Sequence, residues 1–325
     1  MELLKSKNSK SKKASVNFVE YTNIISIIVL LIIFTSINQN FLSSFNIKNL
    51  LEDLAPLLVL GCGVTCVLLI CSIDLSVGSI VSCSTVLFVI LLPKLGYGVY
   101  FVVALYGIMA GLINGVVYTK VKIPSFIVTL GFSSVWQSAA YLISGGAPLQ
   151  IPFQQGNYIA WGKMDFGVIT SYFIIGIVVL AIFYVIQTRT YFGKGFFAVG
   201  ANERAAKISG INVDFVKISA FALCGLTCAL TGIFLSAKLK SGIPTVGDPF
   251  TLKAIAAVAL GGTSLGGGKG SVMNTLLGVA IVTVIHNGMN VVGVNAFWQH
   301  IVFGALVIAA VAMTVDRKER GSIVK

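Results

Sequence analysis

Long apolar runs alternate with short polar stretches along the chain. A run of about 18 or more apolar residues is long enough to cross a bilayer as a helix. We therefore expect an all-α, polytopic membrane protein with about ten transmembrane helices. The predicted segments lie at about 23–37, 54–71, 76–92, 97–118, 125–143, 167–186, 217–237, 252–265, 271–292 and 298–315. The third and eighth are short, so a count of about eight spans stays open.

Polar or glycine-rich sequence interrupts the apolar pattern twice, at 72–79 in the first half and at 261–271 in the second. Non-helical backbone at membrane depth survives only where protein buries it or water lines it. Broken segments in both halves therefore indicate a transport pathway. The second interruption lacks the G-x-x-x-x-G-K-[ST] pattern and a preceding soluble strand, so we do not expect it to bind phosphate.

Composition supports the membrane class, because 56% of the residues are hydrophobic and only 10% are charged, whereas soluble domains are about 25% charged. The net charge is +12, but the basic residues lie at the termini and in short loops. That distribution favours a role in membrane orientation over nucleic-acid binding. The six cysteines lie in apolar segments without a Cys-x-x-Cys pair, so we predict packing roles and no metal or other cofactor.

The positions of the basic residues predict the orientation of the chain. No small-residue cleavage site follows the first apolar run, so this run is expected to be a retained span. With ten segments, the fourth ends at Lys120 and the sixth at Arg189, on the positively charged, cytoplasmic side. Both termini are then cytoplasmic, and 144–166 is external. The expected parts are a disordered basic tail at 1–18, one transmembrane domain at 19–316 and a cytosolic tail at 317–325.

A polar loop at 188–217 lies between two predicted spans and faces the cytoplasm in this topology. Capping residues predict a helix of about two turns inside it: Asn202 at the N-cap, Glu203 in the first turn and Gly210 at the C′ position. One face of that helix would carry the small side chains of Ala205, Ala206 and Ser209. Another protein can approach such a face closely, although an ordinary cytosolic loop is the alternative.

This loop resembles the coupling loop of ribose/galactose-type bacterial ABC importer permeases, through FGK at 192–194, AVG at 198–200, and the residues at 202–211. Further blocks resemble the same family in the same order: IDLSVGS at 73–79, GLING at 111–115, PSFIVTLG at 124–131 and AIAAVALGGTS at 254–264. The resemblance covers about residues 50–315. It implies that the loop fits a groove on an ATPase subunit through Gly200, Asn202, Glu203, Ala205, Ala206 and Gly210.

The resemblance implies the permease subunit of an ABC importer in the bacterial cytoplasmic membrane, with a monosaccharide as substrate and ribose as the first guess. The chain has no Walker sequence and no soluble binding domain. The expected partners are therefore a separate ABC ATPase, an external sugar-binding protein, and a second permease copy or close homologue. ATP hydrolysis is expected in the ATPase partner, so this chain is not itself expected to be an enzyme.

Candidate residues for the translocation path are polar positions in or beside apolar segments: Asp74, Ser76, Thr129, Asn287, Asn290 and Gln299. An intramembrane carboxylate is costly and is often functional, but Asp74 also suits the cap of the helix that begins near Leu75. Candidate docking residues for the binding protein are Lys48, Lys238 and Lys240, on loops expected outside. They would attract acidic surfaces, or extend to lipid headgroups instead.

One departure from the family pattern affects the substrate prediction. The family usually has a Glu and an Asp shortly before the AIAA block, where this chain has Thr251 and Lys253. Nucleosides, autoinducer-type furanoses and branched-chain amino acids therefore remain alternatives within the ABC class. An ion-coupled secondary transporter and a polytopic membrane enzyme are alternatives of other classes. Both would need acidic or histidine groups that are sparse in the apolar segments.

Overall fold

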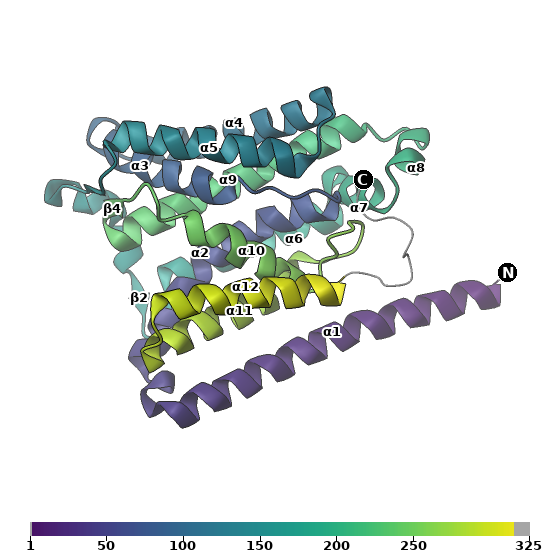
Figure 1. The fold of residues 1–325 in the computed structure, drawn as a ribbon, viewed down its shortest axis with the longest axis horizontal. Coiled ribbons are helices and arrows are strands. Elements are labelled where there is room, and N and C mark those ends of the chain that lie inside the picture. The colour runs from purple at the N-terminus through teal and green to yellow at the C-terminus, as the bar shows by residue number, and fades with distance from the viewer. Residues whose placement is uncertain (1, 315–325) are drawn as a thin grey trace.

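A computed structural model describes residues 2–314, without the side chains of residues 2–19, 163, 165, 311, 313 and 314. The helices lie side by side in one elongated bundle (Figure 1). They are α1 (Glu2–Ile37), α2 (Ser44–Leu69), α3 (Val77–Leu95), α4 (Gly98–Val121), α5 (Ser125–Ser144), α6 (Ser171–Arg189), α7 (Tyr191–Ala201), α8 (Glu203–Ile208), α9 (Val213–Leu239), α10 (Asp248–Leu260), α11 (Val272–Val292) and α12 (Ala296–Thr314).

Each of the ten predicted segments contains a helix, and the helical membrane fold is confirmed. Within residues 2–314, eight helices are long and apolar enough to cross a membrane, and the third segment is one of them, as the 19-residue α3. The eighth segment forms α10, which has only 13 residues. At 1.5 Å per residue this helix is about 20 Å long, shorter than the roughly 30 Å hydrocarbon core. It therefore does not span the core alone.

The two terminal predictions fall in less fully described parts of the chain. Helix α1 begins at Glu2 and thus includes positions 2–18 of the expected tail, whose side chains are not described. Disorder in that segment stays a prediction. The expected tail at 317–325 lies outside the described residues.

Glycines allow α4 and α9 to pack closely against each other. A Cβ at Gly107 would collide with the backbone carbonyl of Gly225, and a Cβ at Gly111 with that of Phe221. At Gly115 it would lie 2.9 Å from the Cα of Ile218. The row of glycines, spaced four residues apart, is therefore a packing surface that brings the two helices together.

The two ends of the bundle differ in structure. The helices α7 and α8 occupy one end, whereas the short antiparallel pairs β1 (Leu149–Gln150) with β4 (Ser241–Gly242) and β2 (Asp165–Phe166) with β3 (Ile169–Thr170) occupy the other (Figure 1). The short helices η1 (Gln39–Leu42) and η2 (Phe153–Lys163) belong to the chain segments beside these strands.

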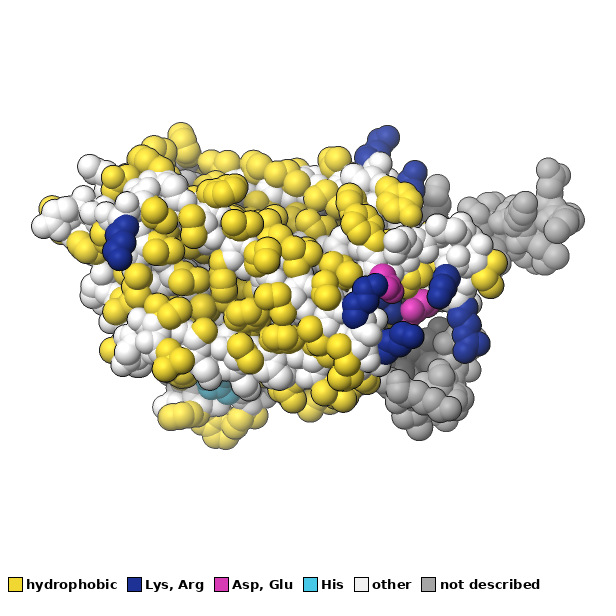
Figure 2. Space-filling view, turned by 90° about the horizontal axis from the view of Figure 1, so that it is seen from above, with side chains coloured by type: hydrophobic (Ala, Val, Ile, Leu, Met, Phe, Trp, Pro, Cys, Tyr) yellow, Lys and Arg dark blue, Asp and Glu magenta, His cyan; other side chains and the backbone are white. Residues whose placement is uncertain are grey.

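The distribution of charged side chains also differs between the two ends of the bundle. Hydrophobic side chains cover the flank of the bundle, and Lys and Arg side chains gather near the end that carries α8 (Figure 2). Basic residues stand in the last turns of α4, α6 and α8: Lys120, Arg189 and Lys207. The flank is suited to lipid, and the charged end to water.

Candidate transport pathway and coupling helix

Asp74 and Ser76 lie in the non-helical segment between α2 and α3. The Asp74 carboxylate accepts hydrogen bonds from the backbone N–H of Ser76 (2.9 Å) and from its hydroxyl (2.6 Å). The side-chain amide of Asn114, on α4, donates to the Ser76 hydroxyl oxygen at 2.7 Å. Helix α3 begins at Val77, two residues later than expected, so Asp74 holds the turn before the helix. The other Asp74 oxygen is buried without a partner among the described residues.

Thr129, on α5, supports the same segment. Its hydroxyl oxygen accepts a hydrogen bond from the backbone N–H of Leu75 at 2.9 Å. Thr129 and Ser76 are fully buried and Asp74 is 4% exposed. The structure thus brings three of the predicted path residues together. They hold the broken segment in place from within the protein, and none of them lines the nearby cavity.

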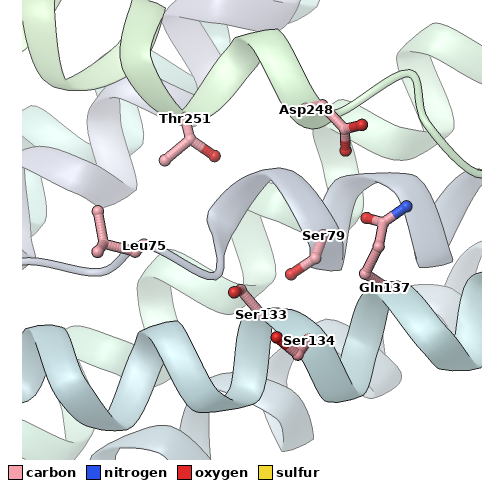
Figure 3. A pocket seen from close by; sticks show the side chains of 7 residues that line it. All are labelled: Leu75, Ser79, Ser133, Ser134, Gln137, Asp248 and Thr251. Carbon is pink, nitrogen blue, oxygen red and sulfur yellow. The ribbon is translucent and has the colours of Figure 1, made fainter.

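A cavity of about 280 Å³ opens between the start of α3, the middle of α5 and the start of α10 (Figure 3). It is lined by Leu75, Ser79, Ser133, Ser134, Gln137, Asp248 and Thr251. Its volume is near the lower end of the roughly 300–1,000 Å³ typical of small-molecule pockets. Ser133 and Ser134 are the ninth and tenth residues of the 20-residue α5. The cavity is therefore near mid-span, where transporters with interrupted helices bind their substrates.

The other three predicted path residues lie elsewhere, at the α11–α12 connection. Asn287, on α11, forms a reciprocal amide pair with Asn46, on α2, with N···O distances of 2.8 and 3.1 Å. The Gln299 amide donates to the Asn290 side chain at 2.8 Å. These contacts join helices or turns, and none of the three residues lines the cavity between α3, α5 and α10.

The second interruption meets the end of α2, which leads into the first interruption, at a glycine junction that we define as Leu69, Gly200, Ala201 and Gly268. The Gly268 N–H donates to the Leu69 carbonyl at 2.9 Å. A Cβ at Gly200, near the end of α7, would collide with the same carbonyl, and one at Gly268 would lie 2.7 Å from the Cα of Ala201. The glycine junction thus connects both broken segments to the chain that leads into α8.

Helix α8 has the predicted caps. The Asn202 side chain accepts from the backbone N–H of Ala205 at 3.0 Å. Gly210 has φ +82°, and its N–H donates to Lys207, while the Ile211 N–H donates to the Ala206 carbonyl, both at 3.1 Å. This is the Schellman arrangement, which requires a left-handed residue at the position of Gly210.

The faces of α8 differ from the expectation in one respect. Ala206 is 4% exposed and packs in the apolar core, so it is not on the outer face that we expected it to share with Ala205. The spacing of a single helical turn does not reveal which side meets the bundle. Glu203 pairs with Lys217, on α9, at 2.8 Å, and Ile208 is 88% exposed.

The three candidate docking lysines were expected on loops, but Lys48 lies in α2 and Lys238 in α9, and only Lys240 follows the end of a helix. Lys238, at the end of α9, pairs with Asp53 at 2.6 Å and lies 3.7 Å from Glu52, both on α2. Lys240 is exposed, and its carbonyl accepts from the Ile151 N–H at 2.9 Å. Lys238 therefore has a structural role in joining α9 to α2.

A family model described as branched-chain amino acid transport system / permease component matches residues 46–311. The match covers most of the chain, including both broken segments, the cavity and α8. The chain belongs to this permease family. It is a multi-pass membrane protein and a transport component.

Curated relatives cover nearly the whole permease. The ribose import permease RbsC of Escherichia coli K12 is 35% identical over 309 residues, which are 93% of this chain and 94% of the relative. RbsC of Bacillus subtilis 168 is 37% identical over 300 residues, covering 91% and 92%. The galactose/methyl galactoside import permease MglC of Escherichia coli K12 is 32% identical over 327 residues, covering 93% and 96%. No solved structure gives a significant match.

Sequence analysis of the permease missed most of the cavity. Ser133 and Gln137 are four residues apart on one face of α5, a polar pair within an apolar helix that was a usable signal. Asp248 stands in a Gly-Asp-Pro sequence that starts α10 before the apolar run begins. The predicted segment at 252–265 does not include Asp248, because the apolar run only starts after this residue.

Proposed function

We propose that this chain is the membrane-spanning permease subunit of an ABC importer that takes up a monosaccharide, with ribose as the first candidate. The observation that carries the proposal is the mid-span cavity beside the first broken segment, lined mainly by hydroxyl and amide groups. Such groups suit a neutral polyol better than an amino acid zwitterion, which favours charged or helix-terminal partners. The relatives named as ribose and galactose permeases support the same substrate class.

The proposed machine needs partners for energy and delivery. A separate ABC ATPase would bind the coupling helix α8, where Gly200, Asn202, Glu203, Ala205 and Gly210 form or lead into the exposed turn, with Ala206 supporting it from inside. An external binding protein would deliver the sugar to the opposite end of the bundle. A second permease copy or close homologue would complete the membrane part. Both termini are cytoplasmic in this arrangement, because the basic end of the bundle then faces inside.

We assign different roles to the predicted path residues. Asp74, Ser76 and Thr129 hold the broken segment that forms one wall of the path. Asn287, Asn290 and Gln299 fix the helix connection near α11 and α12. Lys240 is the candidate docking group for an acidic lobe of the binding protein, together with Lys48, whereas Lys238 keeps its structural pairing with α2. Such charges act mainly on the rate of association.

Uptake of labelled ribose tests the function directly. Cells that lack their own ribose importer would receive the permease with a candidate ATPase and a candidate binding protein from the same organism. We expect uptake that depends on all three proteins and on ATP, and that is competed by ribose more strongly than by galactose or leucine. Stronger competition by leucine, or uptake without the ATPase, would overturn the proposal.

Variants of α8 test the coupling role in the same cells. Ala205→Arg adds bulk on the exposed face, and Gly210→Val places a β-branched residue at φ +82°, which is strongly disfavoured. We expect both to reduce uptake at least tenfold and to lose the ATPase on purification, while the permease still inserts. Ala205→Ser is the matched control and should behave like the wild type. Full uptake and ATPase co-purification in both variants would exclude α8 as the coupling helix.

A further inference from the structure

Two hydroxyl groups that line the cavity between α3, α5 and α10 already use their hydrogens. The Ser79 hydroxyl donates to the backbone carbonyl of Ser76 at 2.8 Å. The Ser133 hydroxyl donates to the carbonyl of Leu130 at 2.6 Å. A hydroxyl has one hydrogen and two lone pairs, so each of these groups presents an acceptor to a ligand.

The Gln137 amide adds a further acceptor, whereas the Thr251 hydroxyl oxygen already accepts a hydrogen bond. The Gln137 side-chain nitrogen donates to the Pro244 carbonyl at 2.6 Å, which leaves its amide oxygen available. The Thr251 oxygen accepts from the Gly78 N–H at 3.1 Å, which fixes that side chain against α3. Ser79, Ser133 and Gln137 therefore each present an acceptor oxygen to a ligand in the cavity.

Asp248 is the one charged residue among those that line the cavity. Figure 3 shows its carboxylate, from α10, and the Gln137 amide, from α5, extending into the same space. Ionised, this group only accepts hydrogen bonds. Lys253 lies about 140° farther round α10 by helical geometry, and its ammonium stands 5.1 Å from the Phe303 ring centroid on α12. The Lys253 side chain therefore contacts α12 and does not line the cavity.

The N-termini of α3 and α10 act against this exclusion of anions, because helix N-termini favour anions. Here protein oxygens already bind some of the backbone N–H groups near the start of α3. The Gly78 N–H bonds to Thr251, and the Ser76 N–H bonds to Asp74. Asp248 itself occupies the first turn of α10. An anionic ligand would thus meet a carboxylate and several acceptors at close range.

We propose that this cavity selects neutral ligands with free hydroxyl groups and excludes anions, and that Asp248 is the specificity-determining residue. The inference deepens the proposed function, because it names the charge and hydrogen-bonding class of the transported sugar. Free sugars would pass, whereas sugar phosphates and sugar acids would be rejected by the permease itself. The rival role for Asp248 is purely structural, as a carboxylate that stabilises the start of α10.

The reaction rates of charged thiol reagents report the electrostatic potential in the cavity, and this measurement needs no substrate. The background is Cys71→Ser, since the other five cysteines are buried. Ser134→Cys places a thiol in the cavity of the full-length, detergent-solubilised permease, and Ser133→Cys is a second probe position. The measured quantity is the ratio of the reaction rate of a cationic methanethiosulfonate to that of an anionic one. We expect this ratio to be on the order of tenfold higher at the cavity positions than at the distant Ser209→Cys.

Asp248→Gln and Asp248→Glu separate charge from structure, because they match each other in size. We expect Asp248→Gln to abolish the cation preference and Asp248→Glu to keep it, with the rates at Ser209→Cys unchanged in both. Equal rates for the two reagents, a preference that survives Asp248→Gln, or no reaction at either probe position would overturn the inference. A structural Asp248 would change protein yield and leave the ratio intact.

Protection by ligands tests the selectivity. Ribose should slow modification of Ser134→Cys, and ribonate should do so only when Asp248→Gln is present. Ribonate protection with Asp248 intact would overturn anion exclusion. If the cation preference is present but ribose fails both to protect and to be taken up by cells, the charge selection is supported and the monosaccharide function is overturned.

Discussion

At the scale of single residues, two buried amide side chains are paired across helices. The amides of Asn46 and Asn287 satisfy each other, and Asn46 also donates to the Phe41 carbonyl at 2.8 Å. Polar groups in an apolar bundle are expensive when unpaired, which gives such pairs a clear structural purpose. Asn287 was a reasonable candidate for the path from its type alone, since sequence does not reveal a partner 241 residues away.

A double-mutant cycle separates pairing from transport at Asn287. Asn287→Leu leaves the Asn46 amide without its partner, and we expect a loss of about 1–3 kcal/mol in stability. Asn46→Leu combined with Asn287→Leu removes both amides, so its loss should be smaller than the sum of the single losses. Thermal unfolding of the purified permease measures this. Additive losses, or abolished ribose uptake in a stable double variant, would instead indicate that Asn287 faces the path.

At the scale of elements, local signals predicted the helices well. Apolar run length located every membrane helix, and Asn202 and Gly210 located the ends of α8, because caps depend on neighbouring residues only. The start of α10 was placed too late, since the pattern begins after Asp248. The cavity was not predictable as a whole, because it depends on how α3, α5 and α10 approach each other. The glycine junction was visible only as a glycine-rich run.

Two neighbouring glycines test the junction. Gly268 has φ +68°, and a Cβ there would lie 2.7 Å from Ala201, whereas a Cβ at Gly266 would be 3.5 Å from its nearest neighbour, the Ser264 hydroxyl oxygen. We therefore expect Gly268→Ala to lower ribose uptake several-fold and to reduce thermal stability by about 1–3 kcal/mol. Gly266→Ala, as the matched control, should stay near wild type. Similar results for the two variants would show that the close approach at Gly268 has no functional consequence.

At the scale of the whole molecule, charge and structure agree on which end is which. Basic residues gather near α8, and the end with the strands carries few (Figure 2). The proposed coupling helix α8 must lie in the cytoplasm, because an ATPase that binds it needs the ATP available there. The opposite end is then the side that receives a sugar from an external protein. One orientation therefore accounts for both proposed interfaces and for the positive-inside rule.

Single-cysteine labelling in intact cells tests that orientation. In the Cys71→Ser background, Gln154→Cys lies in η2, in the segment expected outside, and Ser209→Cys lies beside α8; both native residues are exposed. We expect an impermeant maleimide to label position 154 in intact cells, and position 209 only after the membrane is permeabilised. Both positions should react equally in detergent, which controls for thiol accessibility. Labelling of position 209 alone in intact cells would reverse the topology, and would place α8 where no ATPase can reach it.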